Sequence, residues 1–214
     1  MSYKLRSYFR SSCSWRVRIS LAYKGLSYET IPVHLLKDGG QQHGEPHRHA
    51  NPMRELPVLM VGDEPLAQSM AILEYLEEVH PSPSLLPQDH LGRARVRQMA
   101  EVINSGIQPI QNLRVMQKLQ KDFSLEKADA MKWSADWIRF GFDALEVLVA
   151  KHSGKYCFGN EPSIADACLI PQLFNARRFS VDLEVYPNLT RVESALNAIE
   201  AFQASHPSQQ PDAE

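Results

Sequence analysis

Three prolines within ten residues divide this 214-residue chain into two parts with different periodicity. They are Pro81, Pro83 and Pro87 in the segment 81–90. Proline fixes φ, lacks an N–H group and disfavours helical geometry in the residue before it, so this segment is neither a helix nor a central strand. We predict a linker at residues 82–90, between a domain at residues 1–81 and a domain at residues 91–214.

The part before the linker is typical of a mixed α/β domain. Its apolar runs have the length of strands and are separated by turn residues; they are Leu5 to Phe9, Tyr28 to Leu35 and Pro57 to Val61. Ser69 has the side chain of an N-cap for a helix over Met70 to His80. This order of short strands and helices predicts one α/β unit.

Residues 15–21 permit two interpretations. Apolar and polar residues alternate there, which is the period of a half-buried strand. Small polar residues precede the run, however, and Lys24-Gly25 closes it as a helix C-terminus would. These local signals favour a helix only slightly.

Behind the linker the apolar residues follow a helical period. Stripes run over residues 96–110, 131–149 and 192–202, and Ser163 with Asp166 forms a capping-box pattern. We expect an all-α domain here. The end of the chain, residues 206–214, has no stripe and is expected to be a loosely held tail.

Composition excludes several classes of protein. Hydrophobic residues make up 43% and charged residues 22%, as in globular domains. The net charge of −2 gives no positive field for nucleic acid, and we find neither a signal-peptide pattern nor an apolar run long enough for a membrane helix. Cys13, Cys157 and Cys168 form no CxxC pair, which favours a reducing compartment, the cytoplasm.

The histidines give no metal pattern. His43, His47 and His49 lie in a segment that contains Pro and Gly, and their spacing does not suit a metal-binding helix face. We expect them to be exposed to solvent, and we expect no metal site.

Residues 10–16 combine hydroxyls with a predicted helix start. There Ser11 and Ser12 could stabilise a thiolate beside free backbone N–H groups. Lowering a thiol pKa from about 8.5 to about 6.5 requires about 2.7 kcal/mol. A hydrogen bond to a charged group gives about 1.5–3 kcal/mol and the helix terminus about 0.3–1 kcal/mol. The alternatives are that both serines are simply helix caps, or that Cys13 is itself the nucleophile.

Arginines are the candidates for binding carboxylates, because a guanidinium group matches a carboxylate as a planar fork. We select Arg10, Arg16 and Arg178. The alternative for each is a solvated surface charge.

The run Ser-Ser-Cys-Ser-Trp-Arg-Val-Arg-Ile at residues 11–19 resembles the signature of the zeta class of glutathione S-transferases. Other matching pieces occur in order between residues 6 and about 211, so the resemblance covers nearly the whole chain. They include Lys37 to Gln42, Asn51-Pro52-Met53, Leu56-Pro57, Gln68-Ser69, Leu86 to Asp89, Gly106 to Asn112, Pro171-Gln172 and Arg178 to Leu183.

The resemblance implies an α/β plus all-α fold: a thioredoxin-like N-terminal domain followed by a helical C-terminal domain. It also implies a homodimer, and glutathione held mostly by the first domain. It favours a helix for residues 15–24, against the local alternation.

The resemblance further implies roles for individual residues. Ser11, Ser12 and Cys13 match the thiol-binding motif, with Ser11 at the position that stabilises the thiolate. The implied glutathione contacts are Gln42, Leu56, Gln68 and Ser69 in the first domain and Gln108, Asn112 and Arg114 in the second. Arg178 matches an arginine of the substrate pocket. Arg114 departs from the family, where a smaller polar residue often stands.

The implied activity is the glutathione-dependent isomerisation of maleylacetoacetate to fumarylacetoacetate, a step of tyrosine and phenylalanine catabolism, by reversible thiolate addition. Two alternatives stay within the same chemistry: isomerisation of maleylpyruvate, and transfer or dehalogenation reactions on small α-halo acids. A third is a glutathione-binding module without catalysis. The absence of CxxC disfavours a thiol–disulfide oxidoreductase.

Overall fold

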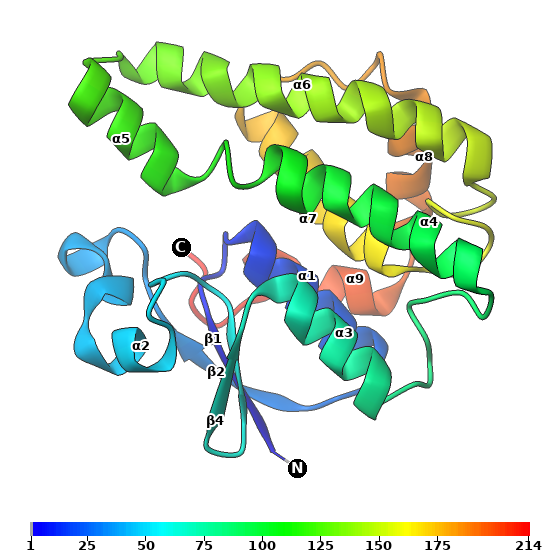
Figure 1. Cartoon of the computed structure of the whole chain (residues 1–214), viewed down its shortest axis with the longest axis horizontal. Coiled ribbons are helices and arrows are strands. Elements are labelled where there is room, and N and C mark those ends of the chain that lie inside the picture. Colours follow the sequence, from blue (N-terminus) through cyan, green and yellow to red (C-terminus); the bar gives the residue numbers. More distant parts are fainter. Residues whose placement is uncertain (1) are drawn as a thin grey trace. The chain divides into compact units, whose positions relative to one another are not determined.

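The computed structural model describes residues 2–214, which form two compact units (Figure 1). The first contains the chain up to Leu85 together with Asn197–Glu214, and the second is Leu86–Leu196. The sequence pattern predicts residues 197–214 as part of the second domain. The structure differs there because this C-terminal segment packs on the first unit, where the helix Glu200–Ala204 (α9) contacts the helix Ser12–Tyr23 (α1).

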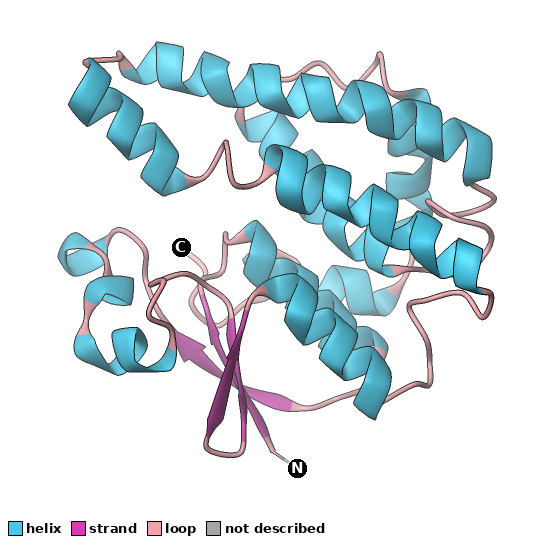
Figure 2. Cartoon of the chain, viewed as in Figure 1, coloured by secondary structure: helices cyan, strands magenta, loops and turns pink. Residues whose placement is uncertain are grey.

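The first unit is a four-stranded mixed sheet with helices on both faces (Figure 2). The strand order is β2-β1-β3-β4, with β1 parallel to β2 and antiparallel to β3, and β3 antiparallel to β4. The strands are β1 (Tyr3–Ser7), β2 (Tyr28–Pro32), β3 (Val58–Val61) and β4 (Glu64–Ala67). Helix α1 connects β1 to β2, and helix α3 follows β4. This βαβ unit followed by ββα confirms the predicted thioredoxin-like fold.

The core of this unit lies between the sheet and two helices, α1 and α3 (Ser69–Val79). It is formed by buried apolar side chains from β1, β3 and both helices, namely Tyr3, Leu5, Val17, Leu21, Leu59, Ile72 and Leu76. The short helix α2 (Glu45–Ala50) lies on the other side of the sheet (Figure 2). Two short 3₁₀ turns, Lys37–Gly39 and Gln41–His43, precede α2.

The segment with two interpretations is a helix, α1. Arg16 and Arg18 are 0% and 1% exposed, so the polar residues of the alternation are buried along with the apolar ones. A period of two therefore does not separate a core face from a solvent face here. Gly25, with φ of +65°, ends the helical run in a conformation that favours glycine.

The second unit is all-helical, as predicted. Its helices are α4 (His90–Glu101), α5 (Leu113–Phe123), α6 (Lys127–His152), α7 (Ile164–Arg178) and α8 (Pro187–Leu196). Helix α7 packs against α4 and α8, and its N-terminus has the predicted capping box of Ser163 and Asp166. Burial raises the pKa of the Asp166 carboxyl, although the hydroxyl of Ser163 and the amide of Cys157 donate to it and act in the opposite direction.

The expected stripe over residues 96–110 is not one helix. After α4 the chain continues as a π-helical segment, Val102–Ile107, whose C-cap is Gln108, directly before Pro109. Gly141 of α6 allows a close approach to this segment, because a Cβ there would lie 2.3 Å from Ile107 Cδ1.

The C-terminal residues are held more firmly than expected. Pro207 is buried, the ring of His206 meets Trp15 edge to face at 5.1 Å, and the Asp212 carboxylate accepts a hydrogen bond from the backbone of Phe9. Sequence patterns did not indicate this, because these contacts join positions far apart in the chain. Within residues 2–214, helices long and apolar enough to cross a membrane are absent.

A buried ion pair fixes the start of the proline-rich segment. The Nζ atom of Lys24 lies 2.7 Å from Glu77 Oε1 and donates to the carbonyl oxygens of His80 and Pro83 at 2.7 and 2.8 Å. Glu77 also accepts from the amide of Leu85 at 3.0 Å. The ends of α1 and α3 are thereby joined to the chain that leaves the first unit.

We predict that Glu77→Ala destabilises the first unit by about 3–5 kcal/mol, because it leaves the ammonium group of Lys24 buried without its counter-ion. Urea unfolding measures this loss. Glu78→Ala, at the exposed neighbouring position of the same helix, is the matched control and should change stability by less than about 0.5 kcal/mol. Equal small losses in the two variants would contradict this assignment.

Candidate functional site

The strand register brings several predicted site segments to one end of the sheet. Ser7 pairs with Pro32 in β2, and Arg6 pairs with Val58, which itself pairs with Ala67 in β4. The chain that leads to Ser11 therefore leaves β1 at the same end where Leu56-Pro57 enters β3 and where Gln68 leaves β4. The loop that contains Gln42 leaves β2 at this end as well.

At this end of the sheet, α1 begins with a serine cap. Ser11 is the N-cap, and its Oγ accepts a hydrogen bond from the amide of Ser14 at 3.2 Å. Because that bond uses a lone pair, the hydroxyl proton of Ser11 can still be donated to an anion. The amides of Ser12 and Cys13 belong to the first turn, whose N–H groups have no acceptor within the helix. The capping interpretation and the thiolate interpretation of Ser11 are thus compatible.

The three motif residues differ in access. Ser11 and Cys13 are partly exposed, whereas Ser12 is buried. Ser11 and Cys13 can therefore meet a ligand through their side chains, and Ser12 can contribute its backbone amide.

Leu56-Pro57 is a cis peptide bond directly before β3. The ladder between β1 and β3 begins at Val58, so the backbone of Leu56 lies beyond the paired residues. A backbone segment in this position can bond to a peptide in the manner of an added strand.

Gln68 has an unusual backbone conformation, with φ of 71° and ψ of 113°, and it caps α3 in place of the predicted Ser69. Positive φ in a residue other than glycine is costly, and such residues are frequent at functional sites. The side chain of Gln68 is exposed and its Nε2 donates to Glu55 at 3.4 Å. Ser69, the first helical residue of α3, is buried.

Arg16 does not have the surface position that a substrate contact requires. It is 0% exposed, and its Nη1 donates to Ser69 Oγ at 3.2 Å. It therefore joins α1 to the first turn of α3. No local pattern indicated this burial, because the alternating run groups Arg16 with the polar positions.

Arg10, in contrast, is partly exposed beside the start of α1. Its Nε and Nη2 donate to the hydroxyl of Tyr8 at 3.2 and 2.8 Å, and its guanidinium lies 5.2 Å from the ring centre of Phe9. These contacts orient a cation one residue before Ser11.

Gln42 lies largely inside the unit. Its Nε2 is 3.5 Å from the carbonyl of Leu35 and 3.2 Å from the Nε2 of His43. Gly40 leaves room for this amide, because a Cβ at Gly40 would lie 2.6 Å from it. Among the described residues, the buried Oε1 of Gln42 has no hydrogen-bond donor.

The remaining predicted residues belong to the second unit, and they do not share one helical face. Gln108 follows the π-helical segment, whereas Asn112 caps α5 and accepts from the amide of Arg114 at 3.2 Å. Arg114 is exposed in the first turn of α5. Arg178 is exposed at the end of α7, where its Nη1 lies 3.3 Å from Asn175 Oδ1.

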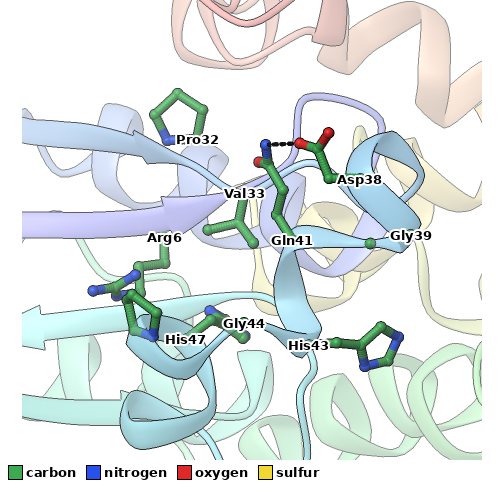
Figure 3. A pocket seen from close by; sticks show the side chains of 11 residues that line it. Arg6, Pro32, Val33, Asp38, Gly39, Gln41, His43, Gly44 and His47 are labelled. Carbon is green, nitrogen blue, oxygen red and sulfur yellow. Dashed lines mark hydrogen bonds between the residues drawn. The ribbon is translucent and has the colours of Figure 1, made fainter.

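A pocket of about 600 Å³ lies on the α2 side of the sheet (Figure 3). Figure 3 shows Arg6 from β1 and His47 from α2 on one side of it, and Asp38 hydrogen-bonded to Gln41 on the other. None of the predicted glutathione contacts lines it.

His47 in this pocket is buried, against the prediction that it is exposed. Its Nε2 lies 3.0 Å from the carbonyl of Glu55, and burial is the main reason that its pKa is lowered. Groups of three or more His, Cys, Asp or Glu side chains suited to a metal ion are absent from residues 2–214.

Sequence reasoning missed two residues at this end of the sheet, Arg18 and Asp212. The Nη2 of Arg18 donates to the carbonyl of Phe9 at 2.9 Å, and Asp212 accepts from the amide of the same residue at 3.0 Å. Neither residue had a local signal. The alternation of residues 15–21 groups Arg18 with the polar positions, and Asp212 lies in a segment without an apolar stripe.

The arrangement fits glutathione. A hydroxyl with a free proton and first-turn amides suit its thiolate, the Leu56 backbone suits its peptide, and the N-terminus of α3 suits a carboxylate. In comparisons of sequence, residues 1–78 match the glutathione S-transferase N-terminal domain, and residues 141–195 match the C-terminal domain of the same family.

Known proteins resemble the whole chain. Maleylacetoacetate isomerase of Rattus norvegicus is 52% identical over 208 residues, which cover 97% of this chain and 94% of the relative. A bacterial maleylpyruvate isomerase described as a zeta-class glutathione S-transferase is similar in structure, with a TM-score of 0.95, 42% identity and coverage of 99% and 100%.

A maleylacetoacetate isomerase from Anaeromyxobacter dehalogenans, solved with glutathione in its active site, has a TM-score of 0.90, 48% identity and coverage of 100% and 98%. The same relative was also solved with dicarboxyethyl glutathione and citrate bound. Identity of this extent over the full length, together with the two domain matches and the shared fold, shows that this chain belongs to the zeta class of the glutathione S-transferases.

Proposed function

We propose that this protein isomerises maleylacetoacetate to fumarylacetoacetate with glutathione as its cofactor. The observation that carries the proposal is the start of α1, where the Ser11 hydroxyl can donate a hydrogen bond beside the first-turn amides. Relatives that are 48–52% identical and bear this activity in their names support the choice of substrate.

Glutathione supplies, when bound, a thiolate that adds to the cis double bond and leaves again after rotation about the single bond. The protein's part is to keep that sulfur ionised and oriented. Ser11 donates its hydroxyl proton as a hydrogen bond toward the sulfur position, and the amides of Ser12 and Cys13 add the positive end of the α1 dipole. Together these contacts supply roughly the 2.7 kcal/mol that lowers a thiol pKa from about 8.5 to about 6.5.

The first unit holds the cofactor in this proposal. Gln42 donates or accepts through its amide, Leu56 bonds through its backbone, and Gln68 with Ser69 offers the N-terminus of α3 to the γ-glutamyl carboxylate. Gln108, Asn112 and Arg114 of the second unit are proposed as further contacts. Arg10 and Arg178, both with accessible guanidinium groups, are proposed to bind the substrate carboxylates. Arg16 is instead assigned a structural role, because its guanidinium donates a hydrogen bond to the Oγ of Ser69.

Turnover on maleylacetoacetate with and without glutathione tests the function. We expect isomerisation that depends on added glutathione and consumes none of it. Equal rates without glutathione would overturn the mechanism.

Maleylpyruvate should be assayed in parallel, because a structural relative is named for that substrate. A higher kcat/KM on maleylpyruvate would replace the substrate in this proposal but keep the chemistry. Binding of glutathione without turnover on either compound would favour a non-catalytic module.

The Ser11→Ala variant should lose most of the activity, with kcat/KM lowered roughly tenfold to a hundredfold, because about 1.5–3 kcal/mol of thiolate stabilisation is removed. The Cys13→Ala variant is the matched comparison two residues away and should mainly change the KM for glutathione. If Cys13→Ala abolishes turnover and Ser11→Ala does not, the cysteine is the nucleophile instead.

We also propose that the protein is a homodimer, as the family resemblance implies. Sedimentation velocity should then give twice the 24.3 kDa mass of the chain. A species of 24.3 kDa that persists at micromolar concentration would contradict this assembly.

We assign the protein to the cytoplasm. Its three cysteines are all free thiols, as a reducing compartment favours.

A further inference from the structure

The loop that presents Ser11 is held by the C-terminal end of the chain. The amide of Phe9, two residues before Ser11, donates to the Oδ2 of Asp212 at 3.0 Å. The amide of Ser11 in turn donates to the carbonyl of Tyr8 at 3.0 Å. Phe9 thus lies in the turn that leads to the α1 cap, and its amide is bound by Asp212 from the C-terminal segment.

Arg18 binds the same turn from the interior of the first unit. Its guanidinium donates to the carbonyl of Phe9 at 2.9 Å and to the Oγ of Ser7 at 3.1 Å, while its Nε donates to the carbonyl of Ser205 at 3.2 Å. Burial lowers the pKa of Arg18 to about 10, so it is still a cation at neutral pH, and the charge of Asp212 favours that cation. Phe9 therefore has its N–H and its C=O fixed by two different side chains.

The C-terminal residues are themselves anchored on the first unit. Glu214 forms an ion pair with Lys37 and lies 3.5 Å from the Nε2 of His34. The ring of His206 packs edge to face on Trp15, in the second turn of α1. Asp212 lies between these two anchors and is half-buried.

We propose that Asp212 is a positioning residue, which sets the geometry of the Ser11 hydroxyl through the backbone of Phe9. This inference rests on the proposed function, because it assigns the ordered turn a role in thiolate stabilisation. A hydrogen bond from a serine to a sulfur anion depends on direction, so a turn that moves freely stabilises the thiolate less.

The experiment compares Asp212→Ala with Asp212→Asn, which retains an oxygen acceptor. Asp63→Ala is the control, since it removes an exposed carboxylate from the turn between β3 and β4, at the other end of the sheet, and leaves the bond to Phe9. Three quantities are measured: amide hydrogen exchange at Phe9 and Ser14, the pKa of the glutathione thiol in the complex, and kcat/KM across pH. Thermal unfolding shows that each variant is folded.

We expect Asp212→Ala to exchange the amide of Phe9 at least severalfold faster, to raise the pKa of the bound thiol and to lower kcat/KM at neutral pH roughly threefold to tenfold, with recovery at higher pH. Asp212→Asn and Asp63→Ala should stay within about twofold of the wild type in kcat/KM.

Unchanged exchange at Phe9 in Asp212→Ala overturns the proposal. So does faster exchange with an unchanged thiol pKa and pH profile, since Asp212 is then only structural. If the wild type does not lower the pKa of the thiol, thiolate stabilisation by Ser11 is wrong and this proposal fails with it. A wild type without glutathione-dependent turnover is instead a failure of the proposed function itself.

Discussion

The buried guanidinium of Arg18 requires hydrogen-bond acceptors inside the first unit, and two of the acceptors belong to the chain that leads to Ser11. The acceptors lie at the end of β1, in the turn before Ser11 and at the carbonyl of Ser205. An unpaired charge at 1% exposure would be strongly destabilising, so these contacts form together with the fold. The same cation thus donates hydrogen bonds both to the turn before α1 and to Ser205 in the C-terminal segment.

The sheet adds a second constraint, because its register decides which loops meet. With β1 parallel to β2 and antiparallel to β3, the loops after β1, β2 and β4 and the loop before β3 share one end. Two helices begin there, α1 at Ser12 and α3 at Ser69, and Arg16 joins them inside the unit. This end of the sheet suits a peptide that carries carboxylates and a thiol. The helix N-termini favour anions, the serine hydroxyl can donate to a thiolate, and the backbone of Leu56, beyond the ladder, can bond to the peptide.

Sequence patterns predicted the α/β and all-α character of the two parts and the capping box at Ser163. These features depend on local chemistry, namely periodicity and caps. The interpretation of residues 15–21 needed the family resemblance, because in α1 both the apolar residues and the arginines are buried. The place of Arg16 beneath Ser69 and the burial of His47 were also not predictable, since each depends on tertiary contacts.

The C-terminal segment shows the same limit. Residues 206–214 contain no apolar stripe, but Asp212 meets Phe9 across 203 positions of the chain. A single polar contact between residues so far apart produces no local sequence pattern. The motif around Ser11 does produce one, because its serines and the start of the helix are adjacent in the chain.

The pKa of the glutathione thiol in complex with the wild-type protein directly tests whether Ser11 and the start of α1 promote ionisation of that sulfur. It is measured by titrating the thiolate absorbance of the bound tripeptide. If Ser11 and the first-turn amides stabilise the thiolate, the bound thiol has a pKa of about 6.5, well below the ordinary thiol value of about 8.5. A bound thiol that still titrates near 8.5 would contradict it.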